Sequence, residues 1–380
     1  MRVLHVITDL DIGGAEMSLY RLLATCGPSI GHETVITLTR AGTLRDRIEA
    51  LGVPVRSLEL NRGLPGPGSA ARAWSVFHGL TGDLLQGWMY HGNIAATFGA
   101  RIVKGRQPVI WNIRHSLHDI KKEKRLTAFL IRLGARLSGT PSAIIYNSEV
   151  SARQHEAIGY ACARRKVIPN GVDCDEFKPR PERRAAMRAA IGCSETAPLV
   201  GMIARNHPMK NAEGFLRAAS KLASGHPDLH LLVAGPGHDC QNRGLATRVQ
   251  EFGLSGRVSL LGERRDVADL MPALDILVLP SSWGEGFPNV VAEAMASGVP
   301  CVVTDIGDSA TVVGDHGIVV PAADDEALRT GIHHLIDVDA DRRRALGAAG
   351  RTHIRERFSI EEVGRRYRTV YEEALNHLDP

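Results

Sequence analysis

Long apolar runs and paired cysteines are both missing from this 380-residue chain. No stretch reaches the roughly 18–20 apolar residues needed to cross a bilayer, so the sequence predicts no membrane-spanning helix. Its six cysteines form no C-x-x-C pair, which predicts free thiols in a reducing compartment, without a disulfide framework or structural zinc. The first nine residues become acidic too soon for a signal peptide and read as a buried strand. We therefore expect a cytoplasmic protein.

A strong overall charge is also missing, because the formal net charge is only +4. The charge is unevenly spread, since residues 101–136 contain ten Lys or Arg against two acids. Within this window, residues 121–137 have leucines at helical spacing, which predicts a basic amphipathic helix suited to anionic lipid headgroups. A core-packed helix with a solvated basic edge is the alternative. The window offers no aromatic stacking platform, so nucleic acid is not expected as a partner. The predicted membrane contacts are Lys121, Lys122, Lys124 and Arg125.

Apolar strand-like segments alternate with helical patterns along nearly the whole chain, which predicts an α/β fold with parallel sheets. Two domains fit the length, and the pattern breaks at the polar, turn-rich residues 170–184. We therefore predict one Rossmann-like domain over residues 1–177 and a second over 178–357, followed by a helix over 358–380. The expected strands include Val3–Thr8, Leu84–Gly87, Val109–Ile113, Ala143–Asn147, Leu199–Ala204, His230–Ala234 and Ile276–Leu279.

Two glutamates, Glu285 and Glu293, flank the segment EGFPNVVAE, which follows an apolar run and opens an apolar helix. Pro288 suits the first helical turn, where its missing N–H costs nothing. The amides of Asn289 and Val290 would then lie at the positive end of the helix, a natural place for phosphate. Carboxylates accept hydrogen bonds from the vicinal hydroxyls of a ribose or another sugar. Together these groups predict a pocket for a sugar joined to a nucleotide through phosphates.

Further candidates stand just after predicted strands. Gly13 and Gly14 follow the first strand, where glycine lets the backbone approach a ligand, although the loop is no G-x-G-x-x-G. Arg205 and Lys210 follow the first strand of the second half, and such a pair suits a diphosphate. His115 closes the run Val109–His115, at the carboxyl end of a strand. Each of these residues has a simpler interpretation, as an ordinary turn, a solvated cation or a structural histidine.

Metal and covalent chemistry find little support. Three Asp-x-Asp triplets occur, beginning at Asp9, Asp173 and Asp337, but they fall in a glycine loop, the boundary segment and a helix end. The pair Ser281-Ser282 lacks a G-x-S-x-G setting, so no hydrolase nucleophile is predicted. We expect no metal and no cofactor, because two basic side chains can neutralise a leaving diphosphate.

The order of these motifs resembles the family-4 retaining glycosyltransferases, which have the GT-B architecture of two Rossmann-like domains facing across a cleft. The resemblance covers nearly the whole chain and rests on five segments in order. It departs from the family at Asn211, where glycine is usual, and Asn211 would instead cap the next helix. The matching segments are Asp11–Glu16, Pro169–Asp173, Arg205 with Lys210, Glu285–Glu293, and the pair Gly307–Ala310 and Gly317–Pro321, the last typical of a surface-polysaccharide branch.

The resemblance implies transfer of a sugar from a nucleotide-diphosphate sugar to a hydroxyl, with retention of anomeric configuration and without an evident protein nucleophile. It favours a UDP sugar, and a glycan or lipid-linked glycan as acceptor, at the cytoplasmic face of the membrane. It also implies that the C-terminal helix crosses back to the first domain, and that His91 is a weaker candidate for acceptor contact. The implied catalytic residues are Glu285, His115, Arg205 and Lys210. The implied donor contacts are Gly13, Gly14, Arg205, Lys210, Gly286, Phe287, Asn289, Val290 and Glu293.

Three alternatives stay open at this point. A nucleotide-sugar 2-epimerase could use the same scaffold but would exchange the hydrogen at C2 of the sugar. A phosphorylase-like enzyme would need a lysine set for pyridoxal phosphate, and no lysine has a recognisable setting for it. A non-catalytic sugar-nucleotide sensor would bind the donor without transferring or hydrolysing it.

Overall fold

The computed structural model describes residues 1–40, 42–60, 67–105 and 107–376, and they form two units with separate parallel sheets. The first unit comprises Met1–Gly171 together with Ile360–Pro380, and the second comprises Val172–Ser359. The first division comes before Phe177, the expected end of the first domain. The reason is that Val172, Cys174 and Phe177 pack into the core of the second unit.

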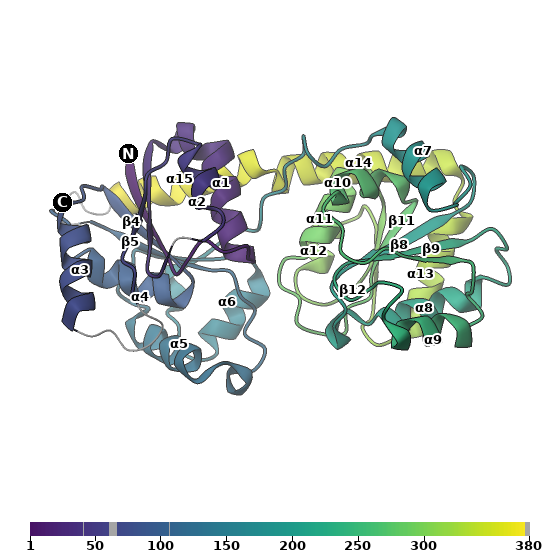
Figure 1. Ribbon diagram of the computed structural model, residues 1–380, viewed down its shortest axis with the longest axis horizontal. Helices are drawn as coiled ribbons and strands as arrows, with labels where there is room; N and C mark the ends of the chain where they lie inside the picture. Colours follow the sequence, from purple (N-terminus) through teal and green to yellow (C-terminus); the bar gives the residue numbers. More distant parts are fainter. Residues whose placement is uncertain (41, 61–66, 106, 377–380) are drawn as a thin grey trace. The chain divides into compact units, whose positions relative to one another are not determined.

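The first unit contains a sheet with strand order β3-β2-β1-β4-β5-β6-β7, all parallel (Figure 1). In the centre, Val6 on β1 pairs with Ile36 on β2 and with Gly87 on β4. The strand order reverses between β1 and β4, so a ligand crevice is expected at the carboxyl ends of these two strands. The strands are β1 (Arg2–Ile7), β2 (His32–Thr37), β3 (Val55–Ser57), β4 (Leu84–Trp88), β5 (Val109–Ile113), β6 (Ala143–Tyr146) and β7 (Arg165–Val167).

Helices cover both faces of this sheet and bury its apolar side chains. One face packs against α1 (Gly14–Ile30), α2 (Arg45–Glu49) and α15 (Ile360–Asn376). The other packs against α3 (Pro67–His78), α4 (Met89–Gly99), α5 (Arg125–Leu137) and α6 (Glu149–Glu156). Two short 3₁₀ helices, η1 (Ile120–Lys122) and η2 (Cys162–Arg164), complete this unit's elements among the described residues.

The C-terminal helix α15 belongs to the first unit, as the family resemblance implied, and lies beside α1 (Figure 1). The thiol of Cys26 on α1 donates to the carbonyl of Ile360 at 3.4 Å. The hydroxyl of Tyr371 donates to the side chain of Gln86 on β4, and both residues are buried. The last helix therefore supplies part of the first unit's core.

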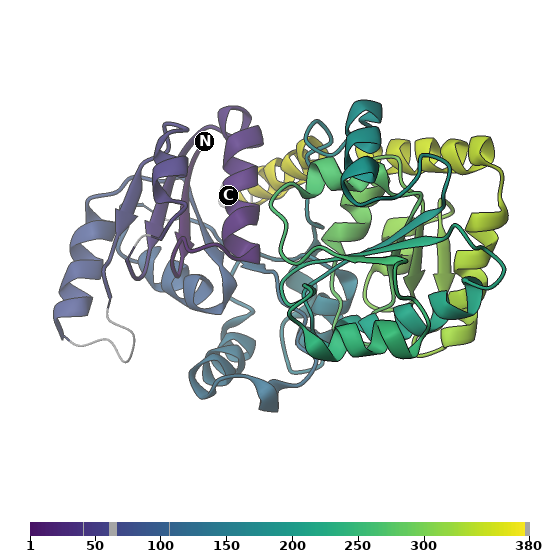
Figure 2. The same cartoon turned by 45° about the vertical axis from the view of Figure 1, so that its right-hand side comes forward.

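The second unit has a parallel sheet of order β10-β9-β8-β11-β12-β13, and here the order reverses between β8 and β11. Figure 2 shows its helices on both faces of the sheet. The strands are β8 (Leu199–Ile203), β9 (His230–Ala234), β10 (Val258–Leu260), β11 (Ile276–Leu279), β12 (Cys301–Thr304) and β13 (Ile318–Val320). One face packs against α8 (Ala212–Leu222), α9 (Arg243–Glu251) and α13 (Asp325–Asp337). The other face packs against α10 (Val267–Leu270), η4 (Met271–Ala273), α11 (Asn289–Ala296), α12 (Ser309–Val313) and α14 (Ala340–Phe358). The short helix η3 (Pro208–Lys210) follows β8.

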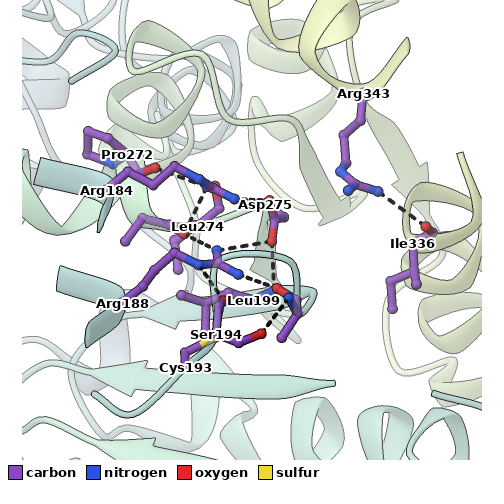
Figure 3. A network of polar contacts seen from close by, with 12 residues as sticks. Arg184, Arg188, Cys193, Ser194, Leu199, Pro272, Leu274, Asp275, Ile336 and Arg343 are labelled. Atoms are coloured by element: carbon purple, nitrogen blue, oxygen red, sulfur yellow. Dashed lines mark hydrogen bonds and ion pairs between the residues drawn. The ribbon is translucent and has the colours of Figure 1, made fainter. Parts of the chain in front are cut away.

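The charged run after the predicted boundary is a helix, α7 (Pro181–Ala190), and two of its arginines, Arg184 and Arg188, turn inward (Figure 3). Arg188 is fully buried and donates to Asp275 at 3.2 Å and to the carbonyl of Ala273 at 2.8 Å. Arg184 donates to the other carboxylate oxygen of Asp275 at 2.7 Å. Asp275 also accepts from the amide of Leu199 at 2.8 Å. One carboxylate thus joins α7 to the amino-terminal ends of β8 and β11.

Helix α14 was not among the expected helices, because its buried face is made largely of glycine. Gly347 and Gly350 share this face with Ile354 and Phe358. A Cβ at Gly347 would lie 2.0 Å from the carbonyl oxygen of Gly298, so any side chain there would push α14 away from the turn between α11 and β12. Among the described residues, no helix combines the length and apolar character that crossing a bilayer requires.

Candidate active site

The second unit brings three predicted site residues to its switch point. Arg205 and Lys210 follow β8, and Glu285 follows β11, the two strands between which the order reverses. Lys210 Nζ lies 2.5 Å from Glu285 Oε1, and the two side chains are 16% and 8% exposed. A main-chain bond of 2.8 Å from the amide of Ser282 to the carbonyl of Met209 joins the two loops. A cation and a carboxylate thus lie together where a doubly wound sheet binds its ligand.

Glu285 is held by a second donor that the sequence did not single out. The hydroxyl of Ser281, which is fully buried, donates to the same carboxylate oxygen that Lys210 contacts. The carbonyl of Ser281 accepts in turn from the Thr304 hydroxyl at 2.6 Å, which ties the turn to β12. From the sequence, Ser281 was considered only as a nucleophile, and this contact with Glu285 was not predicted. Only the three-dimensional approach of β11 and β12 places Thr304 here.

The loop after Glu285 packs closely against the loop after β12. The carbonyl of Gly286 accepts from the amide of Asp308 at 2.9 Å. A Cβ at Gly307 would lie 2.6 Å from the carbonyl oxygens of Glu285 and Gly286, and its φ of +68° also favours glycine. The ring of Phe287 is buried, 5.6 Å from that of Phe358. The side chain of Phe287 is therefore enclosed, so a bound nucleotide sugar could contact only its backbone. The prediction had named the residue as a whole.

Helix α11 begins at Asn289, with Pro288 at its N-cap rather than inside its first turn. The amides of Val291 and Ala292 bond to the Pro288 carbonyl at 3.1 and 3.3 Å. The amides of Asn289 and Val290 lie in the first turn, where helical N–H groups lack intrahelical acceptors. Glu293 comes one turn later and is half-buried. This agrees with the predicted order of a loop acid, a helix start and a helix acid.

Arg205 is exposed on a loop that neighbouring loops hold in place. Asn206 donates its amide to Pro236 at 2.8 Å, and the buried His238 donates Nδ1–H to the carbonyl of Ala204 at 2.8 Å. A Cβ at Gly235 would lie 2.0 Å from that same carbonyl oxygen, so glycine permits this approach. Burial lowers the pKa of His238, which keeps it neutral as a donor to the loop.

Asn211 caps α8, as predicted. Its side-chain oxygen accepts from the amide of Gly214 at 3.1 Å. Its backbone has a φ of +52°, a left-handed conformation that asparagine tolerates better than most residues other than glycine. The substitution for glycine therefore preserves the turn that carries Lys210.

In the first unit, the glycine loop follows β1 at the other switch point. Gly13 is the N-cap of α1, with extended backbone, and a Cβ at Gly14 would meet nothing within 4 Å. Neither the backbone conformation nor packing among the described residues requires glycine at position 14. Asp9 and Asp11 lie near Glu16, and burial, with a smaller contribution from these two carboxylates, raises the pKa of Glu16.

The turn that follows β4 is strained. Met89 has a φ of +60°, which is uncommon for a residue with a long side chain. A Cβ at Gly92 would lie 2.4 Å from the carbonyl oxygen of Val6, so α4 begins directly against β1. This turn places Tyr90 and His91 at the carboxyl end of β4, and burial lowers the pKa of the half-buried His91. Backbone strain of this kind is typical of functional sites.

His115 lies just beyond the carboxyl end of β5, and its side chain is partly buried. Its Nδ1 is 3.1 Å from the hydroxyl of Tyr90, and its Nε2 is 3.6 Å from a carboxylate oxygen of Glu123. Burial lowers the pKa of His115, and the Glu123 carboxylate partly opposes this. One ring nitrogen is therefore occupied and the other faces an acid.

The predicted basic helix is shorter than expected. Helix α5 begins at Arg125, whereas Lys121 and Lys122 belong to η1 and Lys124 is the N-cap of α5. All four predicted basic residues are exposed. Ala128, Ile131 and Gly134 face the core, while Leu126 and Phe129 remain 46% and 58% exposed. The helix thus has an inner apolar face and two outward apolar side chains beside the cations.

Metal-ligating side chains do not gather around Lys210 or Glu285 in the described part of the chain. Two Asp-x-Asp triplets form turns instead, since Asp9 and Asp173 accept from amides two residues later at 3.2 and 2.9 Å. A group of three possible ligands does exist on α13 and after α8, with its atoms within 4.8 Å of one another: His226, His333 and Asp337. Helices α8 and α13 run antiparallel to the strands, so their last turns lie near the amino-terminal ends of the strands. The group is therefore at the opposite end of the strands from Lys210 and Glu285.

Two family models match successive parts of this chain. The model described as Glycosyltransferase Family 4 matches residues 12–176, and the one described as Glycosyl transferases group 1 matches residues 197–338. The chain belongs to the family-4 glycosyltransferases. The two matched regions fall in the first and the second unit respectively, apart from a few residues at the division.

Curated relatives include two mannosyltransferases. The chain is 31% identical over 251 residues to a GDP-mannose-dependent monoacylated alpha-(1-6)-phosphatidylinositol monomannoside mannosyltransferase from Corynebacterium glutamicum. That match covers 63% of this chain and 64% of the relative, slightly less than two thirds of its length. The lipopolysaccharide core biosynthesis mannosyltransferase LpsB of Rhizobium meliloti is 29% identical over 72% of this chain and 81% of its own.

Solved structures establish the fold. A crystal structure of HepE from Anabaena in complex with UDP has a TM-score of 0.84 at 21% identity, covering 98% of this chain and all of that one. Sucrose-phosphate synthase from Thermosynechococcus elongatus has a TM-score of 0.77 at 18% identity, covering 99% of this chain and 100% of that chain. The predicted GT-B architecture of two Rossmann-like units is therefore confirmed.

Proposed function

We propose that this family-4 protein is a retaining glycosyltransferase that moves a sugar from a nucleotide-diphosphate sugar to a hydroxyl of a glycan or lipid-linked glycan. A UDP sugar is the first donor to test, and surface polysaccharide or glycoconjugate synthesis is the expected setting. The single observation that carries the proposal is the Lys210–Glu285 pair at the switch point of the second unit, 2.5 Å apart. A charge pair there suits a donor with an anionic diphosphate and a hydroxyl-bearing sugar.

Each group has a role that follows from its chemistry. Negative charge develops on the leaving diphosphate, and it would be stabilised by Lys210, Arg205 and the first-turn amides of α11. Electrostatic stabilisation of this kind is the largest contribution to the rate enhancement of many enzymes. Glu285 would accept hydrogen bonds from sugar hydroxyls. Because one of its oxygens already accepts from Lys210 and from Ser281, it is better suited to orienting a sugar than to attacking one. Glu293 would bind the ribose diol.

The first unit would contribute the remaining contacts. In this proposal Gly13 and Gly14 let the backbone approach the donor, His115 contacts the donor sugar, and His91 is the weaker candidate for the acceptor side. The open space above Gly14 supports this role, since nothing within the unit fills it. Neither Arg205 nor Lys210 needs a metal to neutralise a diphosphate, so we propose that transfer is independent of divalent cations.

A thermal-shift panel of UDP, GDP and ADP sugars, followed by proton NMR of the product from the best donor, tests the proposal. We expect stabilisation by one class of donor, then slow hydrolysis or transfer that keeps the donor's anomeric configuration, unchanged by EDTA. Inversion would exclude the retaining mechanism. Deuterium uptake at C2 would indicate an epimerase. Donor binding without any turnover would indicate a sensor.

We also propose that η1 and the start of α5 contact anionic membranes. The exposed cations Lys121, Lys122, Lys124 and Arg125 stand beside the exposed Leu126. Basic residues next to a surface of anionic lipid each contribute about 1 kcal/mol, and apolar side chains add to this by entering the interface.

Reversing the charge of Lys121, Lys122 and Lys124 to glutamate is expected to weaken binding to vesicles at least about 100-fold, because about 3 kcal/mol of attraction is lost. Cosedimentation with vesicles of equal parts phosphatidylcholine and phosphatidylglycerol measures this. The triple variant of Lys104, Lys178 and Lys221 to glutamate makes the same change of charge on other exposed lysines and should still bind. Equal losses in both variants would show a general charge effect rather than a docking segment.

A further inference from the structure

Four residues in the first unit form a closed ring of hydrogen bonds: His115, Tyr90, His155 and Ser151. The ring of His115 meets the Tyr90 hydroxyl through Nδ1 at 3.1 Å, and that hydroxyl meets His155 Nε2 at 2.8 Å. His155 Nδ1 lies 2.8 Å from the carbonyl of Ser151. The hydroxyl of Ser151 closes the ring by donating to the carbonyl of His115 at 2.7 Å. Strand β5 and helices α4 and α6 are joined through this ring.

The directions of the three bonds that involve an imidazole follow from one acceptor. The Ser151 carbonyl can only accept, so His155 must carry its proton on Nδ1. Neutral His155 then presents a lone pair at Nε2, which obliges the Tyr90 hydroxyl to donate to it. The Tyr90 oxygen is left to accept from His115, which must therefore carry a proton on Nδ1.

Burial keeps the ring in this protonation state. His155 and Ser151 are fully buried and Tyr90 is 4% exposed. Burial lowers the pKa of His155 to about 4, with the Ser151 carbonyl opposing and His115 adding to the effect. Burial also raises the pKa of the Tyr90 phenol. Tyr146 and Tyr160 pack against the imidazole of His155, and burial raises the pKa of each of these two phenols. The two phenols packed against His155 are therefore kept neutral at ordinary pH.

We propose that Tyr90, His155 and Ser151 are positioning residues that hold His115 as the Nδ1–H tautomer, so that its Nε2 accepts a hydrogen bond from a substrate hydroxyl. This rests on the proposed function, in which His115 contacts the donor sugar. The free nitrogen is an acceptor and not an acid, since a proton on Nε2 would require the imidazolium. Glu123, 3.6 Å from Nε2, is the charged group that would stabilise that imidazolium at low pH.

NMR of the protein labelled with ¹⁵N-histidine tests the tautomer without any reaction. Long-range proton–nitrogen correlations distinguish protonated from bare ring nitrogens, and the His115→Gln and His155→Gln variants assign the signals. At neutral pH we expect His115 to have a protonated Nδ1 and a bare Nε2. Tyr90→Phe should release it to a mixture of tautomers. A protonated Nε2 in the unaltered protein, or an unchanged Nδ1–H signal in Tyr90→Phe, would overturn the proposal.

Kinetics with the best donor test the consequence. Tyr90→Phe should lower kcat about tenfold or more, as loss of a histidine tautomer does elsewhere, with little change in nucleotide affinity. Tyr160→Phe is the matched control, because it removes a buried hydroxyl of the same cluster that donates to the Ile131 carbonyl at 3.1 Å and not to a member of the hydrogen-bonded ring, as far as the described residues show. An unchanged kcat in Tyr90→Phe, while Lys210→Ala still lowers turnover strongly, would refute the positioning role and leave the donor site intact.

The loss of activity at low pH provides an independent test of the proposal. The Glu123 carboxylate favours the imidazolium and so raises the pKa of His115 against the effect of burial. Glu123→Gln should therefore lower that pKa and move the loss of activity to lower pH. If Glu123→Gln loses activity at the same pH as the unaltered protein, or at a higher pH, the requirement for an unprotonated Nε2 would be contradicted.

Discussion

Lys210→Ala is expected to lower kcat/KM for glycosyl transfer by about 10²- to 10³-fold, the usual effect of removing one donor to a developing negative charge. The ammonium is enclosed beside Glu285 and can reach only a ligand at the switch point between β8 and β11. The binding of the nucleotide diphosphate alone should weaken less than turnover, because the charge grows as the bond breaks. Steady-state kinetics and calorimetric titration with the nucleotide separate these two effects.

Two companion variants make this result interpretable. Lys221→Ala removes another lysine of the second unit, one that lies 3.5 Å from Glu326 on its surface, and should keep full activity. Lys210→Arg should not restore the rate, since a guanidinium fork does not occupy the place of an ammonium point charge. Activity of Lys210→Ala within about twofold of the unaltered protein would overturn the phosphate assignment, provided that its thermal unfolding shows a folded protein.

Asp275→Ala is expected to lower the stability of the second unit by about 3–5 kcal/mol, because breaking a buried ion network leaves unpaired charge behind. Arg188 is fully buried, and both Arg188 and Arg184 use this carboxylate as their anionic partner (Figure 3). The amide of Leu199 loses its acceptor as well. Hydrogen exchange measured by mass spectrometry should show faster exchange in β8 and β11, and unchanged exchange in β1.

The control for Asp275 is Asp341→Ala on the same unit. Asp341 also pairs with an arginine, Arg344, but its side chain is 88% exposed. Exposed pairs of this kind contribute little, so the change in stability should stay within about 0.5 kcal/mol. Equal destabilisation by the two substitutions would show that burial of the Asp275 network is not what gives it its importance.

The parallel sheets could be predicted because strands buried on both faces are nearly continuous apolar runs. The ranges expected for Val109–Ile113 and Ile276–Leu279 coincide with β5 and β11. Helices α7 and α14 escaped prediction for the opposite reason. Arg184 and Arg188 point inward as polar anchors, and Gly347 replaces an apolar side chain on a buried face, so neither helix shows the usual amphipathic pattern.

Candidate site residues could be named from the sequence, but the contacts between them could not. The contact between Glu285 and Lys210 depends on β8 and β11 being neighbours in the sheet, which no spacing in the sequence indicates. Ser281 and Thr304 were missed because hydroxyls that orient a carboxylate leave no spacing signal. The ring around His115 was hidden for the same reason, since its members come from β5, α4 and α6.

The membership of α15 in the first unit has a consequence for biosynthesis. Residues 172–359 form one uninterrupted stretch, so the second unit can fold as soon as the ribosome has released it. The first unit begins to emerge earlier but must wait for Tyr367 and Tyr371, which fill its core. Until translation passes them, the nascent N-terminal half exposes an apolar surface. The half that is made first is therefore the last to mature, and it is the one that chaperones have most reason to hold.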